Sequence, residues 1–148
     1  MSLFDSMQVS TSGLYAQRTR INVISSNIAN VHTTRTQEGG PYIRRTTVFG
    51  AIPKAKTFLE ELNQLNETTD VVKEPKVLSI SEDQRAPILK YDPSHPDANE
   101  EGYVAFPNID ITEEMVDLIQ ARRSFEANVV AFNVARGLAQ KSLEIGKR

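Results

Sequence analysis

Apolar residues that recur every seven positions constrain the fold of this chain more than any other feature. Near the N-terminus the repeat consists of Met7, Leu14, Ile21 and Ile28, and Phe4 lies just before it. A repeat of seven places these side chains on one narrow stripe of an α-helix. Because such a stripe is buried by packing against another helix, we predict an N-terminal helix over residues 1–30 that has a helical partner.

The C-terminal part of the chain, residues 108–148, carries a second stripe of the same kind. It consists of Ile111, Leu118, Phe125, Phe132 and Ala139, with Met115 and Leu143 beside it. Asp110 followed by Glu113 is typical of a helix start, where a capping side chain accepts hydrogen bonds from the first free N–H groups. Small side chains that would let another backbone approach are Ala121, Ala127 and Ala135. We therefore predict a C-terminal helix as the partner of the first.

Turns and short extended segments fill residues 31–107 between the two helices. Residues of high β-propensity predict strands at 42–49, 71–72, 77–81, 87–91 and 102–107. Pro75 is expected to separate two of these strands, and leucines at helical spacing indicate a helical insertion near 56–66. The predicted fold class is therefore α+β. Long N- and C-terminal helices pack as an antiparallel coiled coil, and a small β-rich middle domain connects them.

Three asparagines lie on or beside the helical stripes, and each has two interpretations. A buried Asn between packed helices fixes their register at a cost in stability, and Asn27, Asn30 and Asn128 are all candidates. Alternatively, Asn30 is simply polar because it ends the helix with a left-handed backbone, and Asn128 is exposed. The pattern alone leaves both interpretations open.

Charges are interspersed along the chain and gather at no evident site. There are 17 basic and 19 acidic residues, and the one short basic run, Arg44-Arg45, is interpreted as a solvated strand edge. Adjacent acidic residues such as Glu113-Glu114 diverge on a helix, so they are interpreted as solvated as well. These patterns indicate no nucleic-acid partner and no converging carboxylates, and we predict no catalytic residues.

Metal, cofactor and targeting signals are equally weak. Asp92, His95 and Asp97 could gather a cation, but the prolines around them favour an ordinary turn, and the chain has no Cys. We therefore predict no metal site and no cofactor. The N-terminus lacks the cationic and apolar regions of a secretory signal peptide, and no apolar run is long enough for a transmembrane segment.

Both ends of the sequence resemble a known family. Ser25 to Asn30 matches the Ser-x-Asn-Ile-Ala-Asn motif of the flagellar axial proteins, which include the rod and hook subunits. The segments Asn108–Met115 and Ala121–Asn128 resemble the C-terminal signature of the same family. Within it, the turn at Tyr91–Asp97 and the run Gly102–Val104 are most similar to members that build the proximal rod.

The resemblance implies a structural subunit of the bacterial flagellar basal body, one that builds the proximal rod by helical self- and hetero-assembly through its terminal helices. The implied partners are other copies of the chain, proximal and distal rod subunits, and the basal-body ring and export apparatus base. The implied location is the periplasmic rod, reached through the flagellar type III export apparatus without a cleaved signal peptide. Such a subunit is not an enzyme.

We predict that the N-terminal stripe meets Leu118, Phe125 and Phe132 within one subunit, and that Phe4, Met115 and Leu143 contact neighbours. Three alternatives remain open from the sequence. The chain could be a cytosolic helical adaptor, another flagellar axial protein of the rod or hook, or a wall-cleaving enzyme, for which no carboxylate pair is evident.

Overall fold

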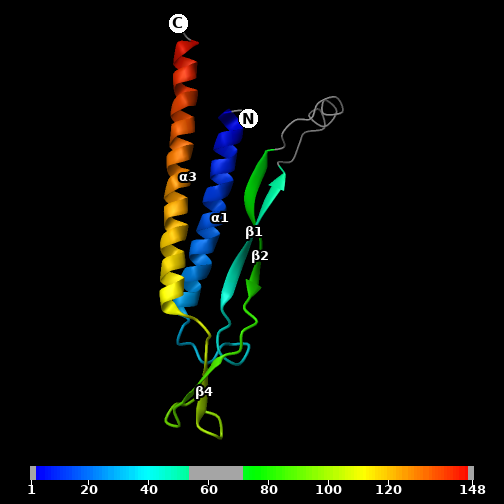
Figure 1. Ribbon diagram of the computed structural model, residues 1–148, viewed down its shortest axis with the longest axis vertical. Helices are drawn as coiled ribbons and strands as arrows, with labels where there is room; N and C mark the ends of the chain where they lie inside the picture. Colours follow the sequence, from blue (N-terminus) through cyan, green and yellow to red (C-terminus); the bar gives the residue numbers. More distant parts are fainter. Residues whose placement is uncertain (1–2, 54–71, 147–148) are drawn as a thin grey trace.

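The computed structural model describes residues 3–53 and 72–146 of the chain, which form an elongated molecule (Figure 1). Two long helices lie side by side, and a two-stranded ribbon runs along one of them. A second, shorter hairpin projects from the end of the molecule that lies away from the two chain termini (Figure 1). The helical insertion that the sequence predicts near 56–66 lies outside the described residues.

The terminal helices are α1 (Leu3–Ala29) and α3 (Ile111–Ile145). Their cross-contacts run in opposite directions along the two sequences, because Asn27 contacts Glu114 whereas Gly13 faces Asn128. The antiparallel packing that the repeats predict is therefore confirmed. Since α3 is longer, its C-terminal end extends past the start of α1 (Figure 1).

The start of α3 and the end of α1 each have a local chemical cause. The Asp110 side chain accepts hydrogen bonds from the N–H groups of Thr112 and Glu113 at 2.8 and 3.4 Å, which confirms the predicted cap of α3. At the end of α1, Asn30 donates from its side chain to the Ser26 carbonyl at 2.8 Å. No described residue other than glycine has a positive φ, so the left-handed conformation predicted for Asn30 is wrong.

The ribbon consists of β1 (Arg45–Pro53) and β2 (Lys73–Glu82), paired antiparallel from Arg45 opposite Glu82 to Pro53 opposite Lys73. It packs along α1, and the Ser12 hydroxyl donates to the Pro75 carbonyl at 2.7 Å. The prediction that Pro75 separates two strands is wrong. A two-stranded ribbon tolerates a proline because each strand has an unpaired edge, where a missing N–H breaks no ladder bond.

The shorter hairpin consists of β3 (Ile88–Tyr91) and β4 (Tyr103–Phe106), also antiparallel, which confirms the two predicted strands of this region. The rings of Tyr91 and Tyr103 meet edge to face with centroids 5.3 Å apart. Gly102 turns into β4 with a φ of +82°, and an added Cβ there would lie 2.9 Å from the Tyr91 ring. Both facts favour glycine at this position.

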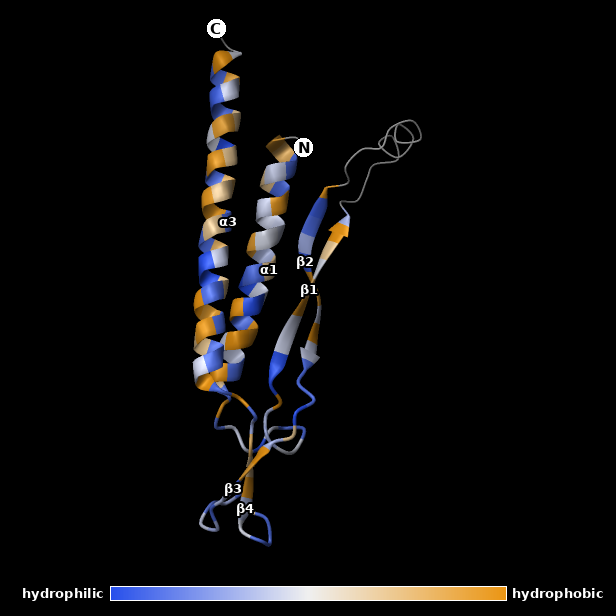
Figure 2. Cartoon of the chain, viewed as in Figure 1, coloured by the Kyte–Doolittle hydropathy of each residue, from blue (hydrophilic) through white to orange (hydrophobic). Residues whose placement is uncertain are grey.

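The apolar core is small and consists largely of small side chains. The buried apolar residues among those described are Ala16, Ile24, Val104, Ile109, Ala121 and Ala135. Ala121 and Ala135 lie on the face of α3 toward α1, as predicted for close approach, whereas Ala127 is exposed. Many larger apolar side chains remain on the surface, and hydrophobic residues follow α3 along its whole visible length (Figure 2).

Gly13 of α1 lies directly against α3. An added Cβ would approach the Asn128 Nδ2 and Oδ1 atoms to 3.0 Å, and Asn128 itself donates to the Ser124 carbonyl at 2.9 Å. Gly13→Ala should gain about 1 kcal/mol of helix propensity but lose it again by displacing Asn128.

We therefore expect Gly13→Ala to stabilise the protein measurably only when Asn128 is also replaced by alanine. Urea unfolding of the two single variants and the double variant measures this coupling. An equal gain from Gly13→Ala in both backgrounds would show that the two residues do not constrain each other.

Candidate assembly site

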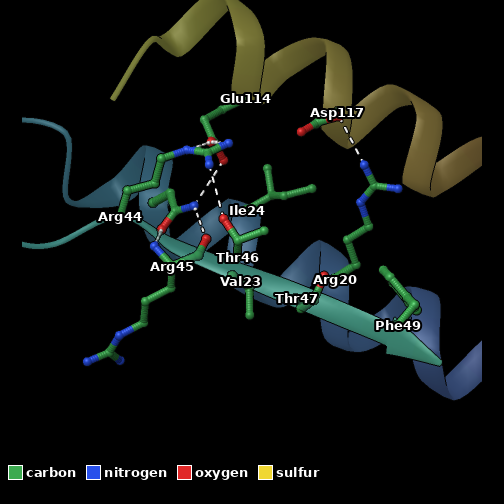
Figure 3. A pocket seen from close by; sticks show the side chains of 11 residues that line it. Arg20, Val23, Ile24, Arg44, Arg45, Thr46, Thr47, Phe49, Glu114 and Asp117 are labelled. Carbon is green, nitrogen blue, oxygen red and sulfur yellow. Dashed lines mark hydrogen bonds and ion pairs between the residues drawn. The ribbon is translucent and has the colours of Figure 1, made fainter. Parts of the chain in front are cut away.

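A cluster of buried polar side chains joins the terminal helices to the ribbon, and we call it the polar junction. Its members are Asn27 of α1, Glu114 of α3, Tyr42 and Arg44 from the segment before β1, and Asp83 directly after β2. Figure 3 shows the Arg44 and Glu114 side chains meeting at its centre. The junction thus collects groups from four separate parts of the chain.

Glu114 is the most deeply buried charged group of the junction, with only 1% of its surface exposed. Its Oε1 atom accepts from the Arg44 Nε and Nη2 atoms, each at 2.7 Å, and its Oε2 accepts from Asn27 Nδ2 at 3.1 Å. The carboxylate also lies in the first turn of α3, where free N–H groups favour negative charge. The buried charge is therefore paired and hydrogen-bonded on both oxygens.

Asn27 uses the full bonding capacity of its side-chain amide. Its Oδ1 accepts from the Arg45 N–H at 3.0 Å and from the Tyr42 hydroxyl at 3.1 Å. Its Nδ2 donates to the Arg45 carbonyl at 2.8 Å as well as to Glu114. The amide thus pairs with the backbone of Arg45 as a neighbouring strand would. Of the candidate asparagines, Asn27 is the one that is fully buried, whereas Asn30 and Asn128 are half-buried.

Arg44 connects Glu114 to the base of the ribbon. Its Nη1 donates to Thr46 Oγ1 at 3.0 Å and lies 3.7 Å from Asp83 Oδ2, and the Asp83 N–H donates to the Arg44 carbonyl at 2.8 Å. The Arg85 guanidinium in turn bonds Asp83 at 2.6 and 2.8 Å, which holds the pKa of that carboxyl below its ordinary value and raises the pKa of Arg85. Positive and negative groups therefore alternate from Glu114 to Arg85.

The interpretation of Arg44 and Glu114 as solvated residues is wrong. Their side chains are 13% and 1% exposed, because each neutralises the other in the interior. Arg45 fits its interpretation better, since its side chain is about half exposed. No spacing rule links an arginine before a strand to a glutamate some seventy positions later, so the pairing had no signal in the sequence.

A second ion pair lies one turn from Glu114 along α3 and joins α3 to α1. Arg20 Nη2 lies 3.0 Å from Asp117 Oδ1, and the two side chains are 28% and 31% exposed. Both ion pairs line one pocket of about 210 Å³, which is shown in Figure 3. The Arg20–Asp117 pair thus joins α1 to α3 in a partly exposed environment, whereas the Arg44–Glu114 pair joins α3 to the segment before β1 in a buried one.

The two helices of this site coincide with the segments that known proteins share. A family model described as "Flagella basal body rod protein" matches residues 7–36, and "Flagellar basal body rod FlgEFG protein C-terminal" matches residues 100–145. The chain is 45% identical to the flagellar basal-body rod protein FlgC of Bacillus subtilis, over 99% of this chain and 100% of that protein. The chain belongs to the FlgC family of flagellar basal-body rod proteins.

Other members of the FlgC family align over nearly their whole length as well. The protein from Borreliella burgdorferi is 41% identical over 98% of both chains, and that from Salmonella typhimurium is 34% identical over 99% of this chain and 100% of its own. This confirms the resemblance to the axial proteins. Asn27 and Glu114 lie inside the matched family segments, whereas Arg44 lies between them.

The predicted packing residues of this FlgC family member fall into two groups in the structure. Half-buried side chains are Met7, Leu14, Ile21, Ile28, Leu118, Phe125 and Phe132. Exposed side chains are Phe4, Met115 and Leu143. The fully buried positions of α1 are instead Ser10, Gly13, Ala16, Ile24 and Asn27. Sequence reasoning missed most of this line because it followed large apolar residues, whereas small and polar residues lie where the backbones are closest.

The face of α3 that points away from α1 carries an uncovered apolar stripe, which we call the outer stripe. Its members are Val116, Ile119, Val130, Val134 and Leu138, and they are between 51% and 62% exposed. Val116 and Ile119 are three residues apart, and Val130, Val134 and Leu138 follow one another at spacings of four. The separation of eleven residues between the two groups makes about three helical turns, so all five members lie on one side of the helix. None of the described helices is long and apolar enough to cross a membrane.

The Asp92–Asp97 segment forms a turn, as its composition predicts. The Asp92 Oδ1 atom accepts from the Ser94 hydroxyl at 2.6 Å and from the Ser94 N–H at 3.1 Å, and these bonds lower the pKa of the Asp92 carboxyl. Asp97 accepts from the Thr34 hydroxyl at 2.8 Å, which fastens the turn to the loop after α1. Within the described ranges, no group of His, Asp and Glu side chains is arranged to hold a metal ion.

Proposed function

We propose that this chain is a structural subunit of the proximal flagellar rod, assembled through its terminal helices with further copies and with other rod subunits. Membership of the FlgC family supports the rod, and the outer stripe of α3 is the observation that carries the assembly mechanism. A helix with two apolar faces, one of which is covered by α1, has a face to offer to a neighbour. Large apolar patches exposed on a soluble protein commonly mark an interaction site.

Different faces of the subunit would meet in such an assembly. The outer stripe lies on α3, whereas exposed Phe4 and Tyr15 lie on α1, so contact between unlike surfaces leads to an open helical array. Within one subunit the half-buried residues Leu14 and Phe125 support the pairing of the helices, and Met115 and Leu143 are available for neighbours.

The same proposal extends to partners and location. The rod subunits that precede and follow the proximal segment, the basal-body ring and the base of the export apparatus would be its contacts. The subunit would reach the periplasm through the flagellar type III apparatus without a cleaved signal peptide. Its family is a structural one, and catalysis has no part in the proposal.

The test is complementation of a strain that lacks the gene for this chain. Wild-type protein should restore rods in electron micrographs of basal bodies and swimming in soft agar. Val134→Asp, which places a charge on the outer stripe, should leave the isolated protein helical but abolish both. Asn133→Asp is the matched control, since it adds the same charge at an exposed polar position beside the stripe, and it should support swimming.

Two outcomes would contradict the proposal. Rods and swimming that persist in the deletion strain, together with a soluble stoichiometric complex in the cytosol, would favour the adaptor. Normal rods with Val134→Asp would show that the outer stripe is not an assembly surface.

For the inner faces, Leu14→Asp or Phe125→Asp should also prevent rod assembly, and retained motility would show that their packing is dispensable.

A further inference from the structure

We propose that the Arg44–Glu114 ion pair and Asn27 form an orienting device. It fixes how the β1–β2 ribbon is held against the helix pair, and its ion pair adds little net stability to the fold. The proposal rests on the proposed function only because rod assembly is one of its readouts.

Arg44 is placed so that it connects the ribbon to α3. The ribbon packs on α1, and α3 packs on α1 as well, while neither strand packs closely on α3 within the described residues. Among the hydrogen bonds and ion pairs of the described residues, those of Arg44 are the ones that join the base of the ribbon to α3. Arg44 and Glu114 therefore close a triangle whose other two sides are the contacts of α1.

Burial reduces the net stability that the Arg44–Glu114 ion pair can contribute. Moving two charges out of water costs several kcal/mol per ion, and their attraction returns about that amount only with good geometry. Replacing a buried pair by apolar side chains of similar size is often neutral or stabilising. The pair is therefore a poor source of net stability, although losing one partner alone is harmful.

The hydrogen bonds of the polar junction are directional. Apolar side chains pack almost equally well after a small shift, but the bonds of this junction do not tolerate one. Both oxygens of Glu114 are occupied, and all four bonding positions of the Asn27 amide are used, two of them by the Arg45 backbone. A shift of the ribbon along α1 would break several of these bonds at once. Buried polar groups fix the register of packed helices in the same way.

The consequence is specific to an assembling subunit. A helical array repeats the geometry of one subunit at every step, so an error in ribbon orientation would recur at each contact. A ribbon held at several angles would still allow the chain to fold but would not match its neighbours. The device therefore acts on assembly and not on folding.

The double variant Arg44→Leu/Glu114→Leu separates these two roles. The isolated protein should unfold at the same or a higher temperature than wild type. Complementation of the deletion strain should nevertheless give at least tenfold fewer rods per cell. The matched control is Arg20→Leu/Asp117→Leu, which removes the partly exposed ion pair between α1 and α3, and it should assemble as wild type does.

A second variant covers the case in which the double variant does not accumulate. Arg44→Lys keeps the charge but loses the forked geometry of the guanidinium, so the chain should fold while rod assembly falls. Rod numbers equal to wild type with either variant would overturn the proposal, as would a double variant that folds but is clearly less stable. The proposed function fails separately, if the wild-type gene itself does not restore rods.

Discussion

Glu114→Ala is expected to destabilise the protein by about 3–5 kcal/mol, as the loss of one partner of a buried ion pair typically does. The substitution removes the carboxylate but leaves the Arg44 guanidinium in the interior, where its charge has lost the contacts at 2.7 Å. Asp83 lies farther from Arg44, at 3.7 Å, and replaces the lost partner incompletely. The side-chain amide of Asn27 also loses an acceptor.

Urea unfolding followed by circular dichroism measures this loss, and Asp117→Ala is its matched control. Asp117 lies on α3 like Glu114 and pairs with Arg20 of α1, but both side chains are partly exposed, so the expected loss is only about 0–1 kcal/mol. Equal losses at Glu114 and Asp117 would show that burial of the carboxylate contributes nothing. In cells, Glu114→Ala should abolish swimming, and Asp117→Ala should preserve it.

Asn27→Ala is expected to cost about 3 kcal/mol or more, because several buried groups lose their partners together. The Arg45 N–H and carbonyl groups bond the Asn27 amide at 3.0 and 2.8 Å, although Arg45 stands opposite Glu82 in the ribbon, and they lose these partners in the alanine variant. Leaving each such group unsatisfied costs about 1–3 kcal/mol where water does not reach it.

Two variants test this assignment of Asn27. Asn27→Asp keeps the shape and the acceptors but removes both donors and places a second carboxylate next to Glu114, so it should be about as harmful as alanine. Asn30→Ala removes a half-buried amide of the same motif whose Nδ2 donates to Ser26, and it should cost about 1 kcal/mol. If Asn30→Ala were the more damaging of the two alanine variants, the motif would serve the helix end and not the junction.

Residues that act through local patterns could be predicted from the sequence. The two repeats of seven gave the helices and their pairing, and Asp110 marked the start of α3 because a cap acts on residues two and three positions away. The strands at 88–91 and 103–106 followed from composition. The strand at 73–82 was predicted as two strands separated by Pro75. That prediction failed because a proline breaks a strand only where the ladder needs an N–H at its position.

The polar junction could not be predicted in the same way, because its bonds join distant parts of the chain. Glu114 looks like its neighbour Glu113 in the sequence, and only one of the two points to Arg44. A glycine inside a helix, such as Gly13, lowers helix propensity, and only the position of Asn128 in the folded protein supplies a reason for it. Burial of a charge depends on a partner that folding brings to it, and a local pattern does not contain that partner.

The unequal lengths of α1 and α3 have a mechanical consequence. Because α3 continues past the start of α1, with Leu143 and Ile145 exposed on the extension, the end of the helix pair is stepped and not flat (Figure 1). Stepped units that stack into a shaft meet along offset joints, as bricks do in a bonded wall. Any cross-section of the shaft would then cut through some helices as well as through contacts between subunits. A twisting load would therefore have to pass through intact helices at every level of the shaft.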